Sequence, residues 1–372
     1  MEGCRGGARD AFPPGDDDPA LAGVAQRVEG WTSKGDVVGA AAYLDEVEAT
    51  VPEDPIGAEA ALWAAELRLR SGMVPDLEPL QRRYGTRHPW RVRRLWLASA
   101  EVLLERNEPR RALRAIQRAR RMNHPRLADL DFLGLRLVAR AFGLRGHADE
   151  QRAAWRATVA TWRKRRDAIE NAIEATTALS PLGHDCRMQS VYAAVADAHL
   201  GLGNLHRSHG DAIFSHPLFR QADKETSAAL LETAHDEYQR AENHYLAVAV
   251  GSFDARPQVI QLMGATEATG LMWERWNDEL VRHVATFFPP PPRIVGAPFT
   301  CPLRDIEPSK RSYRTCVQIA AEFMVDPDRA RRCGERLRAL GDWWWGLEEY
   351  GEFRPPGNRP SPTRIRTAPL PR

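Results

Sequence analysis

The chain has 372 residues, of which 43% are hydrophobic and 27% are charged, and its formal net charge is +2 at pH 7. These values are ordinary for a globular protein. No apolar run approaches the roughly 20 residues that a membrane-spanning helix needs, so we expect no segment that crosses a bilayer.

The small net charge hides an uneven distribution of charge along the chain. Residues 1–80 hold sixteen acids and six bases, a balance of −10, whereas residues 81–126 hold fourteen arginines and three glutamates, a balance of +11. One end is expected to be electronegative and the neighbouring segment electropositive, and the two could pair within one molecule or between molecules. Because the chain has forty-eight arginines and four lysines, a single arginine says less about function here than usual.

Residues 1–20 lack the apolar core of a signal peptide and are predicted to be a disordered leader. A cytoplasmic location is the default expectation for such a chain. Cys4, followed by a tether of Gly, Asp and Pro, is instead similar to the start of a mature bacterial lipoprotein. A periplasmic lipoprotein is therefore kept as the alternative.

Apolar residues between positions 21 and 286 recur at intervals of three and four, which is the period of α-helices. Short polar breaks near residues 34, 70, 106, 144 and 208 predict pairs of antiparallel helices. Three positions spaced i, i+4 and i+7 repeat in the first helix of each pair, and their starts recur at a nearly constant interval along the chain. These first-helix trios are Val24, Val28 and Trp31; Ala60, Ala64 and Leu67; Trp96, Ala100 and Leu103; and Leu135, Ala139 and Phe142.

The second helices keep a fixed offset in only two of the four units. In the first and third units a second trio begins sixteen positions after the first: Ala40, Leu44 and Val47, and Ala112, Ile116 and Ala119. The same offset lands on Asp76 in the second unit and on Gln151 in the fourth. The second helices of those two units should therefore be shifted or irregular.

This pattern resembles the tetratricopeptide-repeat family, whose unit is a helix, a turn and a helix of about 34 residues. The likeness rests on a large, a small and a bulky residue in the first helix, as in Trp96, Ala100 and Leu103. It rests also on turn residues and closing prolines, which are Gly35, Asp36, Asn107, Pro52, Pro89 and Pro125. The resemblance implies an all-α, superhelical array of antiparallel helix pairs over residues 21–286.

The resemblance also implies a groove lined by the first helices, which in this family commonly receives a peptide. The charges expected there are mixed and match no single ligand class. The predicted partner-binding residues are Glu29, Thr32, Ser33, Arg94, Leu97, Glu101, Glu105, Arg136 and Arg140.

The pattern departs from the family beyond residue 147. Residues 148–180 predict an overlong helix. The next first helix should end at a turn formed by Gly210 and Asp211, but its partner trio begins at Ala234, well beyond the usual offset from His199. An insertion of about nineteen residues is therefore expected within this unit.

The C-terminal part begins with four prolines that end the array. Residues 287–311 are predicted to be a Pro-rich linker, residues 312–353 a helical hairpin or cap, and residues 354–372 a disordered basic tail. A turn at Val325 would bring Cys316 and Cys333 together across the hairpin. A disulfide would fit there, but two buried thiols are favoured for a cytoplasmic protein.

Residues 107–125 contain six arginines and form a basic helix. Ala112, Ile116 and Ala119 should face the core, so this helix is a structural element first. Its outer basic patch consists of Arg110, Arg111, Arg114, Arg118 and Arg121. A solvated face is the leading interpretation, followed by contact with an acidic protein or with the chain's own acidic part. Nucleic acid ranks last, because phosphate binders usually add stacking aromatics and lysines.

No phosphate-binding loop, dinucleotide fingerprint, zinc-protease or nucleophile-elbow motif is present. His206 and His209 are a helical pair that could bind a metal with Cys186 or His216, but core packing is the favoured role of the histidine cluster. We therefore predict no cofactor, no metal and no catalysis, and a scaffold or adaptor that binds a protein or peptide partner. The alternatives are an envelope lipoprotein with the same array in cell-surface assembly and a metal-dependent enzyme.

Overall fold

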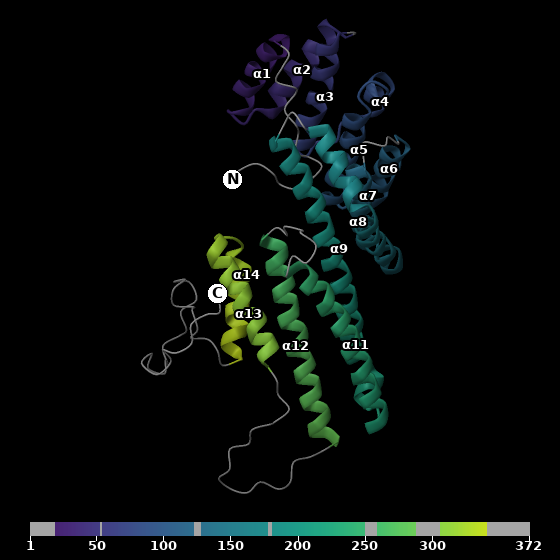
Figure 1. Ribbon diagram of the computed structural model, residues 1–372, viewed down its shortest axis with the longest axis vertical. Helices are drawn as coiled ribbons and strands as arrows, with labels where there is room; N and C mark the ends of the chain where they lie inside the picture. The colour runs from purple at the N-terminus through teal and green to yellow at the C-terminus, as the bar shows by residue number, and fades with distance from the viewer. Residues whose placement is uncertain are drawn as a thin grey trace, which may run out of the picture. The chain divides into compact units, whose positions relative to one another are not determined.

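A computed structural model of the chain describes residues 19–52, 54–122, 128–177, 181–249, 259–287 and 306–340 (Figure 1). Within these ranges every regular element is a helix, and helices adjacent in sequence pack against one another, as predicted for an all-α chain. The predicted leader, Pro-rich linker and basic tail fall mostly outside the described residues. The helices are α1 (Pro19–Thr32), α2 (Val37–Thr50), α3 (Pro55–Arg70), α4 (Glu78–Tyr84), α5 (Pro89–Glu105), α6 (Pro109–Arg121), α7 (Ala128–Leu144), α8 (Ala148–Thr177), α9 (Pro181–Ser215), α10 (Pro217–Gln221), α11 (Lys224–Ala249), α12 (Val259–Phe287), α13 (Glu307–Phe323) and α14 (Pro327–Ala339).

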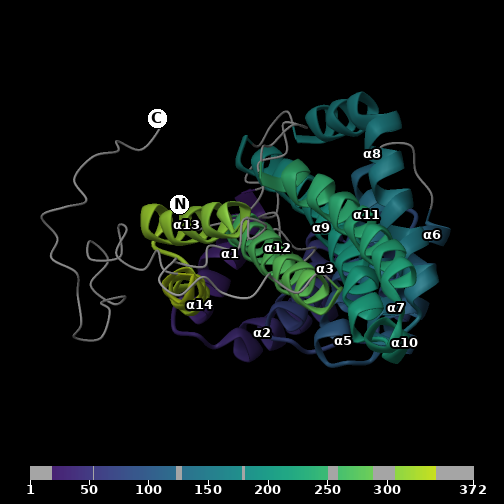
Figure 2. The same cartoon turned by 90° about the horizontal axis from the view of Figure 1, so that it is seen from below.

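The chain divides into two compact units, residues 1–202 and residues 203–372, and the boundary falls within α9. In the first unit, α2 packs against α3, α5 against α6, and α7 against both α6 and α8. In the second unit, α11 and α12 lie side by side in both views, and α13 packs against α12 and α14 (Figure 2). None of the described helices combines the length and apolar character that a bilayer crossing requires.

One turn geometry recurs in the first unit. Gly35, Gly72, Asn107 and Gly146 all have positive φ values, between 59° and 81°, and follow the ends of α1, α3, α5 and α7. At each, the amide of the left-handed residue donates to the carbonyl three positions back, and the next amide donates to the carbonyl five positions back, at 2.8–3.1 Å. This is the Schellman motif, which ends a helix by satisfying its last carbonyls. The predicted breaks near residues 34, 70, 106 and 144 are therefore confirmed as turns.

The small residues of the first-helix trios lie in the core. Ala64, Ala100 and Ala139 have no exposed surface, as close approach between paired helices requires. Of the larger residues in these trios, Leu135 and Phe142 are partly buried, and Trp31 has 42% of its surface exposed. The second-helix residues expected inside are also buried, except for the half-buried Val47, and they are Ala40, Leu44, Ala112, Ile116 and Ala119.

The predicted irregularities of the second and fourth units are present. The second unit has only the short helix α4, which begins at Glu78 and has 7 residues, against 14 in α2 and 13 in α6. The fourth unit has the overlong α8 of 30 residues, whose backbone leaves the helical region at Arg165 (φ −125°). The repeat is therefore kept in the first helices and in α2 and α6, and it is broken in α4 and α8.

The predicted turn at Gly210 and Asp211 is wrong, because α9 continues through both residues to Ser215. Gly210 serves another purpose: a Cβ atom there would lie 2.4 Å from Cε1 of Tyr238 on α11. The Tyr238 hydroxyl then donates a 2.5 Å hydrogen bond to Oδ1 of Asp211. The expected insertion is absorbed by the longer helices α9 and α11 and by α10 between them.

The same arrangement of a glycine and a tyrosine recurs in the second unit. A Cβ atom on Gly203 would lie 2.6 Å from Cε1 of Tyr245, whose hydroxyl donates to Oδ1 of Asn204 at 2.8 Å. A Cβ atom on Gly270 of α12 would likewise lie 2.5 Å from Cε1 of Tyr313 on α13. These glycines let an aromatic ring lie directly against a neighbouring helix.

The helical hairpin predicted in the C-terminal part consists of α13 and α14, joined by a turn in which Met324 and Asp326 have positive φ. As expected, the turn brings Cys316 and Cys333 together, with a Cα–Cα distance of 6.4 Å. The favoured interpretation of two thiols is wrong, because the two sulfurs form a disulfide. Both residues are fully buried in a core that also contains Met263 of α12.

Candidate functional site

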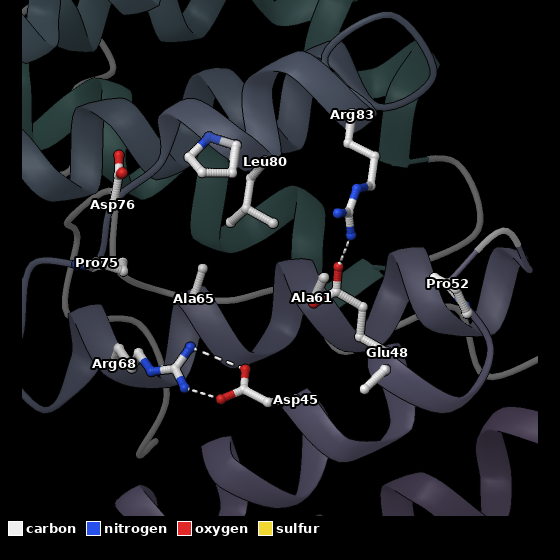
Figure 3. A pocket seen from close by; sticks show the side chains of 12 residues that line it. Asp45, Glu48, Pro52, Ala61, Ala65, Arg68, Pro75, Asp76, Leu80 and Arg83 are labelled. Atoms are coloured by element: carbon white, nitrogen blue, oxygen red, sulfur yellow. Dashed lines mark hydrogen bonds and ion pairs between the residues drawn. The ribbon is translucent and has the colours of Figure 1, made fainter.

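A cavity of about 460 Å³ lies between α2, α3 and α4 (Figure 3). Its volume falls within the range of sites that hold small ligands, roughly 300–1,000 Å³. Its apolar surface comes mainly from Ala61 and Ala65 of α3, Leu80 of α4, and prolines from the connecting segments and α4. The prolines are Pro52, Pro75 and Pro79, which carry no backbone N–H groups.

The cavity lies beside the irregular second helix of the second unit. After the turn at Gly72, the segment with Pro75 and Asp76 is not helical, and Oδ1 of Asp76 accepts a hydrogen bond from the amide of Glu78 at 3.1 Å, at the start of α4. Buried Leu77 then anchors the start of α4. Because α4 has half the length of α2, it leaves part of the α2 and α3 surface uncovered.

Two ion pairs occupy separate places along the cavity lining (Figure 3). The Arg68 guanidinium donates to both carboxylate oxygens of Asp45, with a 3.1 Å contact from Nη1 to Oδ1. Arg83 of α4 pairs with Oε1 of Glu48 on α2. The lining thus places charged groups that can donate and accept hydrogen bonds beside an apolar surface.

Tyr84 supports the Glu48 side of the cavity. Its hydroxyl donates to Oε1 of Glu48 at 3.1 Å. Burial, together with the Glu48 carboxylate, raises the pKa of the Tyr84 hydroxyl above its usual value, against the opposing effect of Arg83. Tyr84 therefore remains a hydrogen-bond donor at neutral pH and holds Glu48 in place. Oε2 of Glu48 has no hydrogen-bond partner among the described residues, which leaves an acceptor for a ligand.

The structure places the residues predicted for the peptide groove in different environments. Arg94, Leu97 and Glu101 of α5 are 6%, 1% and 8% exposed, because α3, α4, α6 and α7 all pack against this helix. A peptide lying over α5 would therefore not reach these three side chains. Of the remaining predicted residues, those that are exposed are Glu29, Ser33 and Glu105, and those that are partly buried are Thr32, Arg136 and Arg140.

Charges on successive first helices pair with one another. Arg140 of α7 lies 3.8 Å from Glu101 of α5, and Arg136 of α7 lies 2.5 Å from Asp197 of α9. Arg91 of α5 pairs with Glu59 of α3. The predicted groove residues Arg136, Arg140 and Glu101 therefore bind neighbouring helices, and the sequence did not reveal this because each partner lies on another helix.

Residues 81–126, which we call the basic segment, pair with the acidic first eighty residues within one molecule. Arg83 binds Glu48, Arg91 binds Glu59, and Arg118 binds Glu78 at 2.5 Å. The charge distribution left open whether the acidic and basic parts pair within one molecule or between molecules. For these three arginines the pairing is within one molecule.

The predicted basic patch lies on the outer face of α6. Arg110, Arg111, Arg114 and Arg121 are exposed, and Arg118 is partly buried. Arg111 pairs with Glu108 one turn earlier, and Arg118 also lies over the Trp96 ring, 5.4 Å from its centroid.

The histidine cluster does not form a metal site in the described part of the chain, where no group of three or more His, Cys, Asp or Glu side chains could hold an ion. His206 and His209 instead face Glu237 of α11, with Nδ1 to Oε2 distances of 2.7 and 3.7 Å. His216 accepts a 3.2 Å hydrogen bond from the amide of Leu218 at the start of α10. The side chain of Cys186 lies outside the described residues.

Comparison with known proteins adds nothing to this geometry. No protein-family model, no curated protein and no solved structure matches the chain.

The cavity was not predicted from the sequence, although one signal pointed to it. Asp76 occupies the position where the repeat expects a core residue, and that mismatch marks the unit in which the second helix is too short to cover its neighbours.

Proposed function

We propose that this protein is a non-catalytic helical-repeat scaffold of the tetratricopeptide type that binds a peptide segment of a partner protein in the cavity between α2, α3 and α4. One observation carries the proposal: the array opens a cavity of about 460 Å³ where its second unit departs from the repeat. Its apolar floor suits a hydrophobic side chain. Its carboxylates and guanidiniums suit the N–H and C=O groups of an extended peptide.

The experiment uses the full chain as bait for a displayed library of random peptides, and then tests the selected peptides against two variants. Ala49→Trp places a large side chain at the exposed α2 edge of the cavity. Ala42→Trp is the matched control, because Ala42 is also exposed on α2 but lies two turns away, about 10 Å along the helix, and does not line the cavity.

We expect Ala49→Trp to weaken peptide binding at least about tenfold, which corresponds to about 1.4 kcal/mol, and Ala42→Trp to leave it unchanged. Selected peptides that bind both variants equally would place the binding site elsewhere. Failure to select any peptide would remove the support for a peptide-binding scaffold.

The second candidate is an envelope protein built on the same array, and the disulfide between Cys316 and Cys333 favours it. Stable disulfides are typical of oxidising compartments and rare in the cytoplasm. Alkylation of the protein in intact cells, followed by mass spectrometry with and without reduction, tests this candidate. Cysteines that react only after reduction support it, and cysteines alkylated without reduction contradict it.

A further inference from the structure

The arginines of the basic segment fall into two groups. The first group has partners inside the molecule: besides the three that bind acids of the first eighty residues, Arg106 donates to the carbonyl of Gly72 at 2.5 Å and Arg93 to that of Met122 at 3.4 Å. The second group is exposed, and no described residue pairs with its side chains. Its members are Arg82, Arg87, Arg110, Arg114, Arg120 and Arg121.

Three residues of the second group lie on one face of α6. Arg110, Arg114 and Arg121 are spaced i, i+4 and i+11, so their directions fall within about 40° of one another around the helix axis. They extend about 16 Å along it. We call these three residues the arginine stripe. The opposite face of α6 is closed by buried alanines and Ile116, so the stripe has a rigid base.

The stripe carries positive charge that no described residue compensates. Like charges three or four positions apart on a helix destabilise it, and Arg114 has such neighbours on both sides, in Arg110 and Arg118. Among the described residues, Glu108 and Glu78 bring carboxylates to this helix, and they pair with Arg111 and Arg118. An anionic partner would relieve the remaining repulsion.

We propose that the arginine stripe is a docking surface for an acidic segment of another protein, separate from the cavity. The molecule itself shows the mode of recognition: Arg118, on the same helix, binds a carboxylate of Glu78 presented by the neighbouring helix α4. The basic segment repeats this mode in Arg83 and Arg91. Nucleic acid fits less well, because α6 contains neither an aromatic residue for base stacking nor a lysine.

The test measures binding of fluorescein-labelled poly-L-glutamate to the full chain by fluorescence anisotropy. The stripe variant is Arg110→Gln, Arg114→Gln and Arg121→Gln; glutamine favours helix about as well as arginine and removes the repulsion, so folding should be retained. The matched control changes three exposed bases elsewhere in the first unit to glutamine and lowers the net charge equally. Those bases are Arg145, Arg156 and Lys164.

We expect the stripe variant to bind poly-L-glutamate about tenfold more weakly than the native chain, and the control to stay within about twofold. An equal loss in both variants would show that net charge alone attracts the probe and would overturn the proposal. A single-stranded oligonucleotide of matched charge is measured in parallel. Tighter, stripe-dependent binding of the oligonucleotide would overturn it in favour of a phosphate partner. Circular dichroism checks that both variants are folded, and the cavity variant Ala49→Trp should bind poly-L-glutamate normally.

Discussion

Burial of His199 makes the stability of the first unit sensitive to pH. The side chain is 3% exposed, and burial, with a smaller contribution from the charge of Arg163, lowers the pKa of His199 from 6.5 to about 4. The unfolded chain therefore binds this proton at a higher pH than the folded chain does, so stability falls as the pH drops from about 6.5 towards 4. Between about pH 8 and pH 5 these two pKa values give a loss of about 2 kcal/mol in the free energy of unfolding.

Urea denaturation at the two pH values, followed by circular dichroism, measures this loss. Other groups also titrate in the interval, so the native chain is compared with His199→Leu. This variant replaces the imidazole with an apolar side chain of similar size that cannot bind a proton. We expect the native chain to lose about 2 kcal/mol more than this variant on acidification. Equal losses in the two proteins would show that His199 does not stay neutral in the fold and would refute the reasoning.

Glycine substitutions test the turns and the close helix contacts by thermal denaturation. Gly72→Ala should lower the free energy of unfolding by about 1 kcal/mol or more, because φ is +81° there. Gly30→Ala should raise it by about 0.5–1 kcal/mol, because nothing lies within 4 Å of a Cβ atom at that position of α1. Similar effects of both would argue against the left-handed turn. Gly210→Ala should lower the free energy of unfolding by about 1–3 kcal/mol, because its Cβ atom would overlap the Tyr238 ring. Gly264→Ala should leave it unchanged or raise it, because the atom nearest to a Cβ there is 3.7 Å away. A neutral Gly210→Ala would mean that α9 and α11 are not in close contact.

The helix pairs of the first unit could be predicted from the sequence because their signals are local. Gly35, Asn107 and Gly146 each follow an apolar periodic segment, and a residue that tolerates positive φ at that place ends a helix whatever lies elsewhere in the chain. Gly210 carries the same local signal, yet its role is set by Tyr238, which lies on another helix further along the chain. A glycine therefore predicts either a turn or a close contact, and only the partner decides between them.

The charged residues of the first helices show a second limit of the same kind. The period of the repeat assigned Arg136 and Arg140 to one face of their helix, and that face does meet neighbouring first helices. What the period could not supply was the partner: Asp197 belongs to α9, far beyond Arg136 in the sequence, and Glu101 belongs to α5, well before Arg140. A face that looks like a binding groove in sequence is thus partly occupied by the molecule's own ion pairs.

The departures from the repeat locate the candidate site better than the repeat itself. Where the period is kept, small residues such as Ala100 close the space between paired helices, and such contacts leave no room for a ligand. Where Asp76 replaces a core residue, the second helix is delayed and shortened, and the cavity lies beside it. Its lining combines three segments with Arg68 and Arg83 held by acids of α2, so its existence depends on the length of α4 and could not be derived from periodicity alone. Among the described residues, the helix pairs thus leave this cavity open where the second helix, α4, is too short to cover its neighbours.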